Sequence, residues 1–182
     1  MPHLTALNAM PAAVADSAFR QCCGSRRWAD AMTAARPFAS VDALHAAADR
    51  IWGELGPADW REAFAMHPRI GERESVPVSG PSSGSGPSSG SGRAAGWSAG
   101  EQAVAATADE ATRRELAEVN RQYEARFGHV YLVCATGRTA EELLADARRR
   151  MQNDAQAELI VAAEEQRRIT RLRLERLLEE RG

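Results

Sequence analysis

The stretch that decides the fold class is residues 154–180, DAQAELIVAAEEQRRITRLRLERLLEE. It contains neither Gly nor Pro, and its apolar residues recur every three or four positions, as they do along one face of an α-helix. The stretch therefore predicts one long helix whose inward face is formed by Leu159, Ala163, Ile169, Leu172 and Leu177.

Shorter helices are predicted from the residues that typically start and stop them. Ser25 and Ser40 are good N-caps, and Pro57 suits the first position of a helix. Gly128 is typical of the position just past a helix end, and a helix from residue 26 should stop before Arg36-Pro37, because a residue that precedes proline avoids the α region. The predicted helices cover residues 12–22, 26–35, 41–55, 57–66, 98–107, 110–126 and 139–152.

Two segments depart from the helical pattern. Residues 130–134, VYLVC, resemble a strand, but five residues cannot form a sheet without a partner, so an extended segment is expected. Residues 79–92, SGPSSGSGPSSGSG, cannot contribute to a core and predict a flexible loop. Neither half of the chain offers a complete set of apolar faces, so we predict one domain over residues 1–182: an all-α, irregular bundle of seven or eight helices with this segment and loop.

The composition excludes several kinds of chemistry and partner. All 23 basic residues are Arg, which leaves no lysine for a Schiff base, for pyridoxal phosphate or for a P-loop. The net charge of -2 gives no electrostatic reason to expect nucleic acid or a membrane as partner. The histidines and cysteines lack the spacing of a metal site, so we expect no bound metal. An odd cysteine count and no visible targeting or membrane segment favour the cytoplasm.

Two places near helix ends could carry chemistry. His67 lies where a helix ends, beside the rigid Pro68, and an imidazole held there suits proton transfer near neutral pH; a histidine that only interacts with the helix dipole would fit equally. Residues 98–102, SAGEQ, open a helix whose free N–H groups could bind a carboxylate. The same pattern is explained if Ser98 and Glu101 merely cap that helix.

Arginines in the last two predicted helices raise a similar choice. Arg173 shares a helix face with Ile169 and Leu177, and a buried guanidinium needs either a protein carboxylate or an anionic ligand. Alternatively, its charged end reaches solvent or pairs within the protein. The run Arg148 to Arg150 is interpreted most simply as a favourable charge at a helix C-terminus.

Taken in chain order, short stretches of this sequence resemble the 2-oxo-4-hydroxy-4-carboxy-5-ureidoimidazoline (OHCU) decarboxylase family, which carries out the last step from urate to (S)-allantoin. Each stretch is short, but the ordered set is specific and covers nearly the whole chain outside residues 79–92. The stretches are CGSRRW at 23–28, RPF at 36–38, HPRIG at 67–71, WSAGEQ at 97–102, NRQY at 120–123, RFG at 126–128, VCA at 133–135, GR at 137–138, EL at 158–159 and ITRLRL at 169–174.

The resemblance implies an all-helical homodimer that decarboxylates OHCU without a cofactor. It implies catalytic roles for His67, Glu101 and Arg173, with a small molecule as the partner. It also implies that residues 131–135 contact the substrate through backbone groups. The substrate contacts that it implies are Pro68, Ser98, Ala99, Gly100, Glu101, Gln102, Tyr131, Leu132, Val133, Cys134, Ala135 and Arg173.

Two other functions remain open. A non-catalytic helical protein, whose Arg-rich last helix docks a partner, would place His67, Glu101 and Arg173 far apart or facing solvent. A related hydrolase of the urate pathway would need an activated water, and the sequence offers no metal site to activate one.

Overall fold

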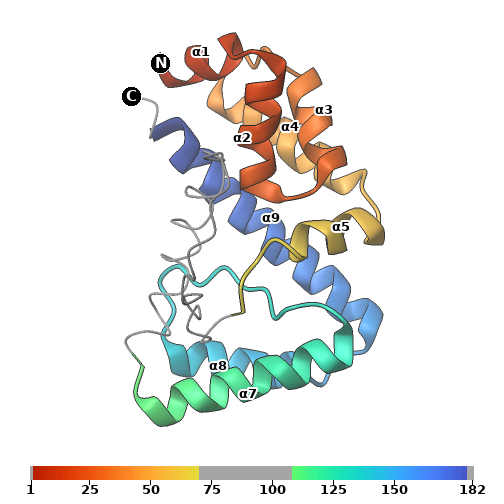
Figure 1. Ribbon diagram of the computed structural model, residues 1–182, viewed down its shortest axis with the longest axis vertical. Coiled ribbons are helices and arrows are strands. Elements are labelled where there is room, and N and C mark those ends of the chain that lie inside the picture. The colour runs from red at the N-terminus through yellow and green to blue at the C-terminus, as the bar shows by residue number, and fades with distance from the viewer. Residues whose placement is uncertain (1, 70–107, 180–182) are drawn as a thin grey trace, which may run out of the picture.

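The computed structural model describes residues 2–69 and 108–179, and it confirms the predicted all-α fold. Within these residues there are eight α-helices and no β-strand (Figure 1). The predicted loop at 79–92 and the predicted helix at 98–107 lie outside the described residues. The helices are α1 (Pro2–Ala9), α2 (Ala12–Cys23), α3 (Arg26–Ala34), α4 (Val41–Gly53), α5 (Pro57–Phe64), α7 (Glu110–Phe127), α8 (Ala140–Arg150) and α9 (Ala155–Glu179).

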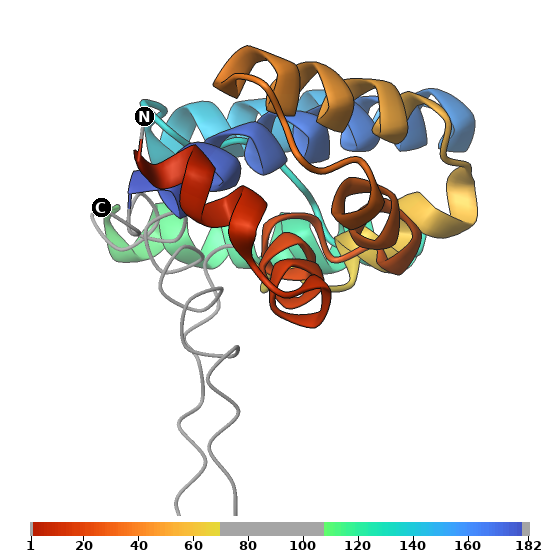
Figure 2. The ribbon, with the colours of Figure 1, turned by 90° about the horizontal axis from the view of Figure 1, so that it is seen from above.

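Helix α9 is the axis around which the other elements are arranged. It contacts α1, α2, α4, α5 and α7, and Figure 1 shows it crossing the molecule diagonally between α1 to α4 and the α7–α8 pair. Seen from above, α4 lies along it (Figure 2). Four of its five predicted inward residues are buried, and Leu172 is only half-buried. A helix that contacts so many neighbours buries more of its surface than one apolar stripe.

The predicted helix starts are confirmed where the signal is local. The Ser25 hydroxyl accepts from the backbone N–H of Trp28 at 3.3 Å, and the Ser40 hydroxyl accepts from that of Ala43 at 3.0 Å. Thr139 and Glu142 cap each other reciprocally, each side chain accepting from the other's backbone N–H. Each such bond satisfies one of the N–H groups that a helix start leaves unpaired.

One glycine brings the corner between α2 and α3 against the end of α5. Gly24 has a φ of 90°, a left-handed conformation that side chains rarely adopt. A Cβ added there would lie 2.7 Å from Cγ of Met66. The absence of a side chain therefore lets α2 approach the residue that precedes His67, which helps to place that histidine inside the molecule.

Helix α1 was not among the predicted helices. Leu4 and Leu7 bury their side chains in the core. The Arg36 guanidinium donates to the backbone oxygens of Leu7 at 2.9 Å and Met10 at 2.8 Å. These contacts come from elements distant in sequence, so α1 owes its position to tertiary packing rather than to a local start signal.

Two hydrophobic clusters form the core, and the extended segment between α7 and α8 joins them. The larger cluster lies among α1 to α5 and α9, and the smaller one lies between α7 and α8. Side chains in an extended segment alternate between opposite sides. Accordingly Leu132 and Cys134 pack into the first cluster, whereas Tyr131, Val133 and Ala135 belong to the second. The prediction of an extended segment rather than a strand is confirmed.

Candidate active site

His67 follows the last turn of α5 and is buried, with 8% of its surface exposed. Its backbone N–H donates to the carbonyl oxygen of Phe64 at 3.1 Å, which continues the helical turn as far as the histidine. Its ring nitrogen Nε2 lies 2.9 Å from Oε1 of Gln166 on α9. The imidazole is therefore held between α5 and α9, and its position is more than a contact with the helix dipole.

Gln166 is a site residue that the sequence analysis missed. It is fully buried, and its Nε2 donates to the hydroxyl oxygen of Thr170, one turn further along α9, at 3.1 Å. Thr170 is also hydrogen-bonded to Cys23 at the end of α2. His67 is thus connected through two side chains of α9 to α2.

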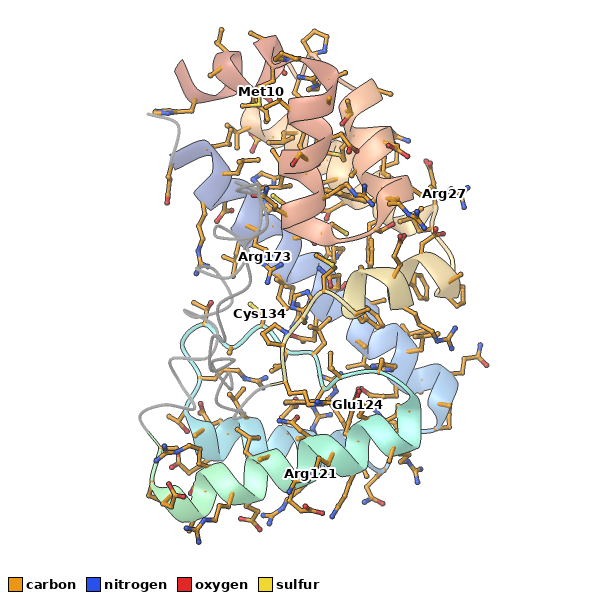
Figure 3. All side chains as sticks on the ribbon, in the orientation of Figure 1. Met10, Arg27, Arg121, Glu124, Cys134 and Arg173 are labelled. Atoms are coloured by element: carbon orange, nitrogen blue, oxygen red, sulfur yellow. The ribbon has the colours of Figure 1, made fainter. Side chains whose placement is uncertain are left out.

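Arg173 lies on the same face of α9 and is 2% exposed, as its apolar neighbours predicted. One of its guanidinium nitrogens donates to the backbone oxygen of Gln21 at 3.4 Å. Figure 3 shows it in the middle of the molecule. Burial, and next the positive charge of Arg173, lower the pKa of His67 from its usual 6.5 to about 3, although the bond to Gln166 opposes the shift. His67 is consequently a neutral base at physiological pH.

Two backbone groups of the extended segment 131–135 are already engaged, one by a side chain of α9 and one by a side chain of α8. The N–H of Cys134 donates to Oε2 of Glu165 at 2.8 Å. The carbonyl oxygen of Leu132 accepts from Nη1 of Arg150, also at 2.8 Å. In Figure 3 Cys134 lies below Arg173, on the side of α7 and α8. The segment thus runs beside the part of α9 that holds Gln166, the neighbour of Glu165.

The side chain of Tyr131 points into the second cluster. Its hydroxyl donates to the Asp146 carboxylate at 2.7 Å and lies 3.2 Å from the carbonyl oxygen of Leu143. Burial, followed by the hydrogen bond to Asp146, raises its pKa. A substrate contact from Tyr131 would therefore have to use its backbone, as the resemblance implied.

Arg150 corrects the interpretation of residues 148–150. The sequence suggested a charge at a helix C-terminus, but Arg150 is 1% exposed and its Nη2 lies 2.5 Å from Oε1 of Glu158, which is fully buried. Tyr123 donates its hydroxyl proton to the same carboxylate, and Asn153 donates to its second oxygen at 2.7 Å. With Tyr123, this buried pair connects α7, α8 and α9 next to the segment that contains Leu132.

The remaining predicted site residues fall into two groups. Pro68 is half-buried next to His67, and the following Arg69 forms an ion pair with Glu124 of α7, with Nε and Oε2 2.6 Å apart. Residues 98–102, with Glu101 among them, lie outside the described residues, so their place relative to His67 stays a prediction.

Neither a metal cluster nor a membrane span is found in the described part of the chain. In residues 2–69 and 108–179, no group of three or more His, Cys, Asp and Glu residues could hold a metal ion. None of the described helices combines the length and the apolar composition that a membrane span requires.

Comparison with known proteins identifies the family. Residues 8–175 match the OHCU decarboxylase family profile. The uric acid degradation bifunctional protein TTL of Arabidopsis thaliana is 35% identical to this chain over 170 residues. These residues are 93% of this chain but 49% of that protein, so the chain spans about half the length of this curated relative. A crystal structure of OHCU decarboxylase in the presence of (S)-allantoin shares 32% identity with a TM-score of 0.71, covering 90% of this chain and 98% of that one.

A second solved structure supports the fold alone. It is an (S)-allantoin synthase with 17% identity and a TM-score of 0.66, and the match covers 98% of this chain and 53% of that one. The family match extends over nearly the whole sequence and agrees with the ordered motifs and the helical architecture. The chain belongs to the OHCU decarboxylase family.

Proposed function

We propose that this chain catalyses the decarboxylation of OHCU to (S)-allantoin in urate degradation, without a cofactor. The observation that carries the proposal is the buried, neutral His67, which is held against α9. Arg173 is buried on the same side of that helix. A base and a cation so close together in the interior suit an anionic substrate that must exchange protons. Membership in the OHCU decarboxylase family supplies the substrate class.

The substrate itself can accept the electrons that decarboxylation releases. Its carboxylate and hydroxyl share one ring carbon, which is bonded to the carbon of a ring C=N. When the bond to the carboxylate breaks, CO₂ leaves, the electron pair moves into the C=N system, and the ring nitrogen gains a proton. The resulting enol then loses its hydroxyl proton while the neighbouring carbon gains one. No lysine imine is needed, in agreement with a chain that has no lysine.

The site residues divide these tasks. Arg173 binds an anionic oxygen of the substrate, because a buried guanidinium is a strong donor to carboxylates. His67, neutral before the substrate binds, takes up the proton that the enol hydroxyl releases and returns a proton to the neighbouring carbon. Glu101 orients His67 or exchanges a proton with the substrate hydroxyl. Protonation from one face yields a single enantiomer.

The burial of His67 and Arg173 favours this enzyme over a non-catalytic interaction protein. That alternative predicted these side chains to be apart or in solvent, whereas they are 8% and 2% exposed and the Arg173 charge acts on the histidine. We also propose that the chain acts as a cytoplasmic homodimer, with support from the family resemblance and from the odd number of cysteines. Light scattering of the purified chain tests the dimer.

The activity is tested by generating OHCU in situ from urate and following (S)-allantoin by circular dichroism. The chain should accelerate formation of one enantiomer over the spontaneous, racemic decay. His67→Asn, Glu101→Gln and Arg173→Met should each lower turnover by roughly 10²-fold or more, as expected for groups that act in the transition state. Arg171→Met serves as the matched control, since Arg171 lies two positions away on α9 but is exposed. A wild-type chain with no acceleration would refute the proposal.

A further inference from the structure

The partner of His67 is an amide, and an amide has one donor end and one acceptor end. A neutral imidazole likewise carries a proton on only one of its two nitrogens. The end of Gln166 that faces the ring therefore determines which nitrogen carries the proton. In this structure the facing atom is the oxygen, Oε1, at 2.9 Å from Nε2 of His67.

The orientation of the Gln166 amide is set by Thr170. The amide nitrogen donates to the Thr170 hydroxyl oxygen at 3.1 Å. That hydroxyl is also hydrogen-bonded to Cys23, and this bond acts to lower the pKa of the thiol, as a bond donated to the sulfur does. All three side chains are buried, at 0% exposure for Gln166 and Cys23 and 5% for Thr170, so water does not offer alternative partners. The hydrogen bonds therefore run in one direction, from His67 to Gln166 and from Gln166 to Thr170 to Cys23.

We propose that Gln166 is a positioning residue which, oriented by Thr170, holds His67 as the Nε2–H tautomer and makes Nδ1 the atom that accepts a proton from the substrate. The inference rests on the proposed function for its catalytic consequence, but the tautomer itself does not depend on the substrate. In the reaction, Nδ1 takes the proton that the enol hydroxyl releases, and the Nε2–H bond to Gln166 stays in place throughout. Gln166 does not need to touch the substrate.

The charges around His67 agree with this assignment. Among the described residues, the charged group acting on the ring is Arg173 of α9, and it opposes protonation. On the α2 side the titratable group is Cys23, whose pKa is raised to about 12 mainly by burial, so it is an uncharged thiol. A neutral ring needs a defined tautomer, and the amide of Gln166 defines it.

The tautomer can be observed directly by long-range ¹H–¹⁵N correlation spectra of the ¹⁵N-histidine-labelled protein. The chemical shifts of His67, assigned by comparison with His67→Asn, should show a protonated Nε2 and an unprotonated Nδ1 near neutral pH. A protonated Nδ1 would overturn the inference. This readout needs no substrate, so an inactive wild-type chain would refute the proposed function and leave the tautomer to be tested separately.

Thr170→Val tests the role of the hydroxyl at nearly constant volume. Without the hydroxyl the amide can reverse, so a population with Nδ1–H should appear and kcat should fall by about tenfold or more. KM should change less, because neither residue contacts substrate. Thr170→Ser keeps the hydroxyl and should restore both the tautomer and kcat. Loss of activity in Thr170→Val with an unchanged Nε2–H tautomer would count against the inference.

Gln166→Glu keeps the acceptor but adds a negative charge. The ring should remain protonated at Nε2, and its titration should move to higher pH by about one unit or more. Gln156→Glu is the matched control, because Gln156 lies on the same helix and is exposed. It should leave the His67 titration where it is. Equal behaviour of the two variants would contradict a specific role for Gln166.

Discussion

His67 remains neutral in the interior, and this links the stability of the fold to pH. Its pKa of about 3 in the folded state, set by burial and then by Arg173, lies below the value near 6.5 expected in the unfolded chain. Between these two values the unfolded state binds the extra proton. Stability from this group is therefore complete above about pH 6.5 and is lost as the pH falls toward 3.

We expect the free energy of unfolding to decrease by up to about 1.4 kcal/mol per pH unit below pH 6.5 because of His67. Urea denaturation at several values between about pH 4.5 and 7.5 measures this slope. His67→Asn should have the smaller slope of the two proteins. His45 and His129, whose pKa values burial also lowers, are present in both and cancel in the comparison. Identical slopes would show that His67 does not carry the effect.

His67 and Arg173 could be identified from the sequence, but Gln166 and Arg150 could not. His67 has a distinctive neighbour in Pro68, and Arg173 interrupts an apolar face. Gln166 lies in a run of charged residues, a pattern that is typical of a helix face exposed to solvent. It is nevertheless three positions before Ile169 and seven before Arg173, which places it on the same helix face as both. Extending that face by one turn would have included it. In the run 148–150, nothing local distinguishes the buried arginine from its two neighbours.

At the scale of elements, the buried pair of Arg150 and Glu158 fixes the extended segment between α7 and α8. Arg150 contacts the backbone of Leu132 and the carboxylate of Glu158, and its guanidinium lies over the ring of Tyr131, 4.9 Å from the centroid. Removing two charges from water is costly, and the cost is offset only when the remaining hydrogen bonds are satisfied. Here Tyr123 and Asn153 donate hydrogen bonds to the carboxylate of Glu158, one to each oxygen.

Arg150→Met should destabilise the protein by about 3–5 kcal/mol, because it leaves Glu158 buried without its countercharge. Arg121→Met on α7 is the control: Arg121 pairs with Glu118 at the surface, where such a pair contributes less than about 1 kcal/mol. The double variant Arg150→Met with Glu158→Leu should recover part of the loss. Urea denaturation of the wild type and the three variants measures the differences, and equal stability of the two single variants would refute the argument.

Helices with strong local signals could be predicted, whereas α1 could not. Ser25, Ser40 and Thr139 cap their helices through bonds within three residues, so the sequence around them contains the whole signal. The position of helix α1 depends on Arg36 and on burial of its leucines against distant elements. Contacts with distant elements cannot be recognised from the residues of the helix and its immediate neighbours in the sequence.

At the scale of the whole molecule, the two clusters share an extended segment and a helix. The segment sends alternate side chains into both, and α9 contacts elements on both sides. The sequence predicted the segment's conformation, but all five residues of VYLVC are apolar, so it did not reveal that opposite sides face different clusters. Because both clusters pack against the same segment and the same helix, the described part of the chain should unfold as one unit.

The distribution of aromatic residues makes this testable. Both tyrosines of the chain, Tyr123 and Tyr131, belong to the second cluster, whereas Trp28, Trp52 and Trp60 lie in or against the first. In a Trp97→Phe background, tryptophan fluorescence and the ¹⁹F signals of fluorotyrosine should give the same urea midpoint. Two separate midpoints would show that the clusters unfold independently.

The extended segment also provides a position for chemical labelling, Cys134. Cys22 and Cys23 are fully buried, and the high pKa of Cys23 keeps its thiol unreactive, whereas Cys134 is half-buried. A thiol-selective fluorophore should therefore attach at one position without any cysteine having to be removed. Because the backbone of Cys134 is bonded to Glu165, the neighbour of Gln166, such a label would report ligand binding at the site as a change in its emission.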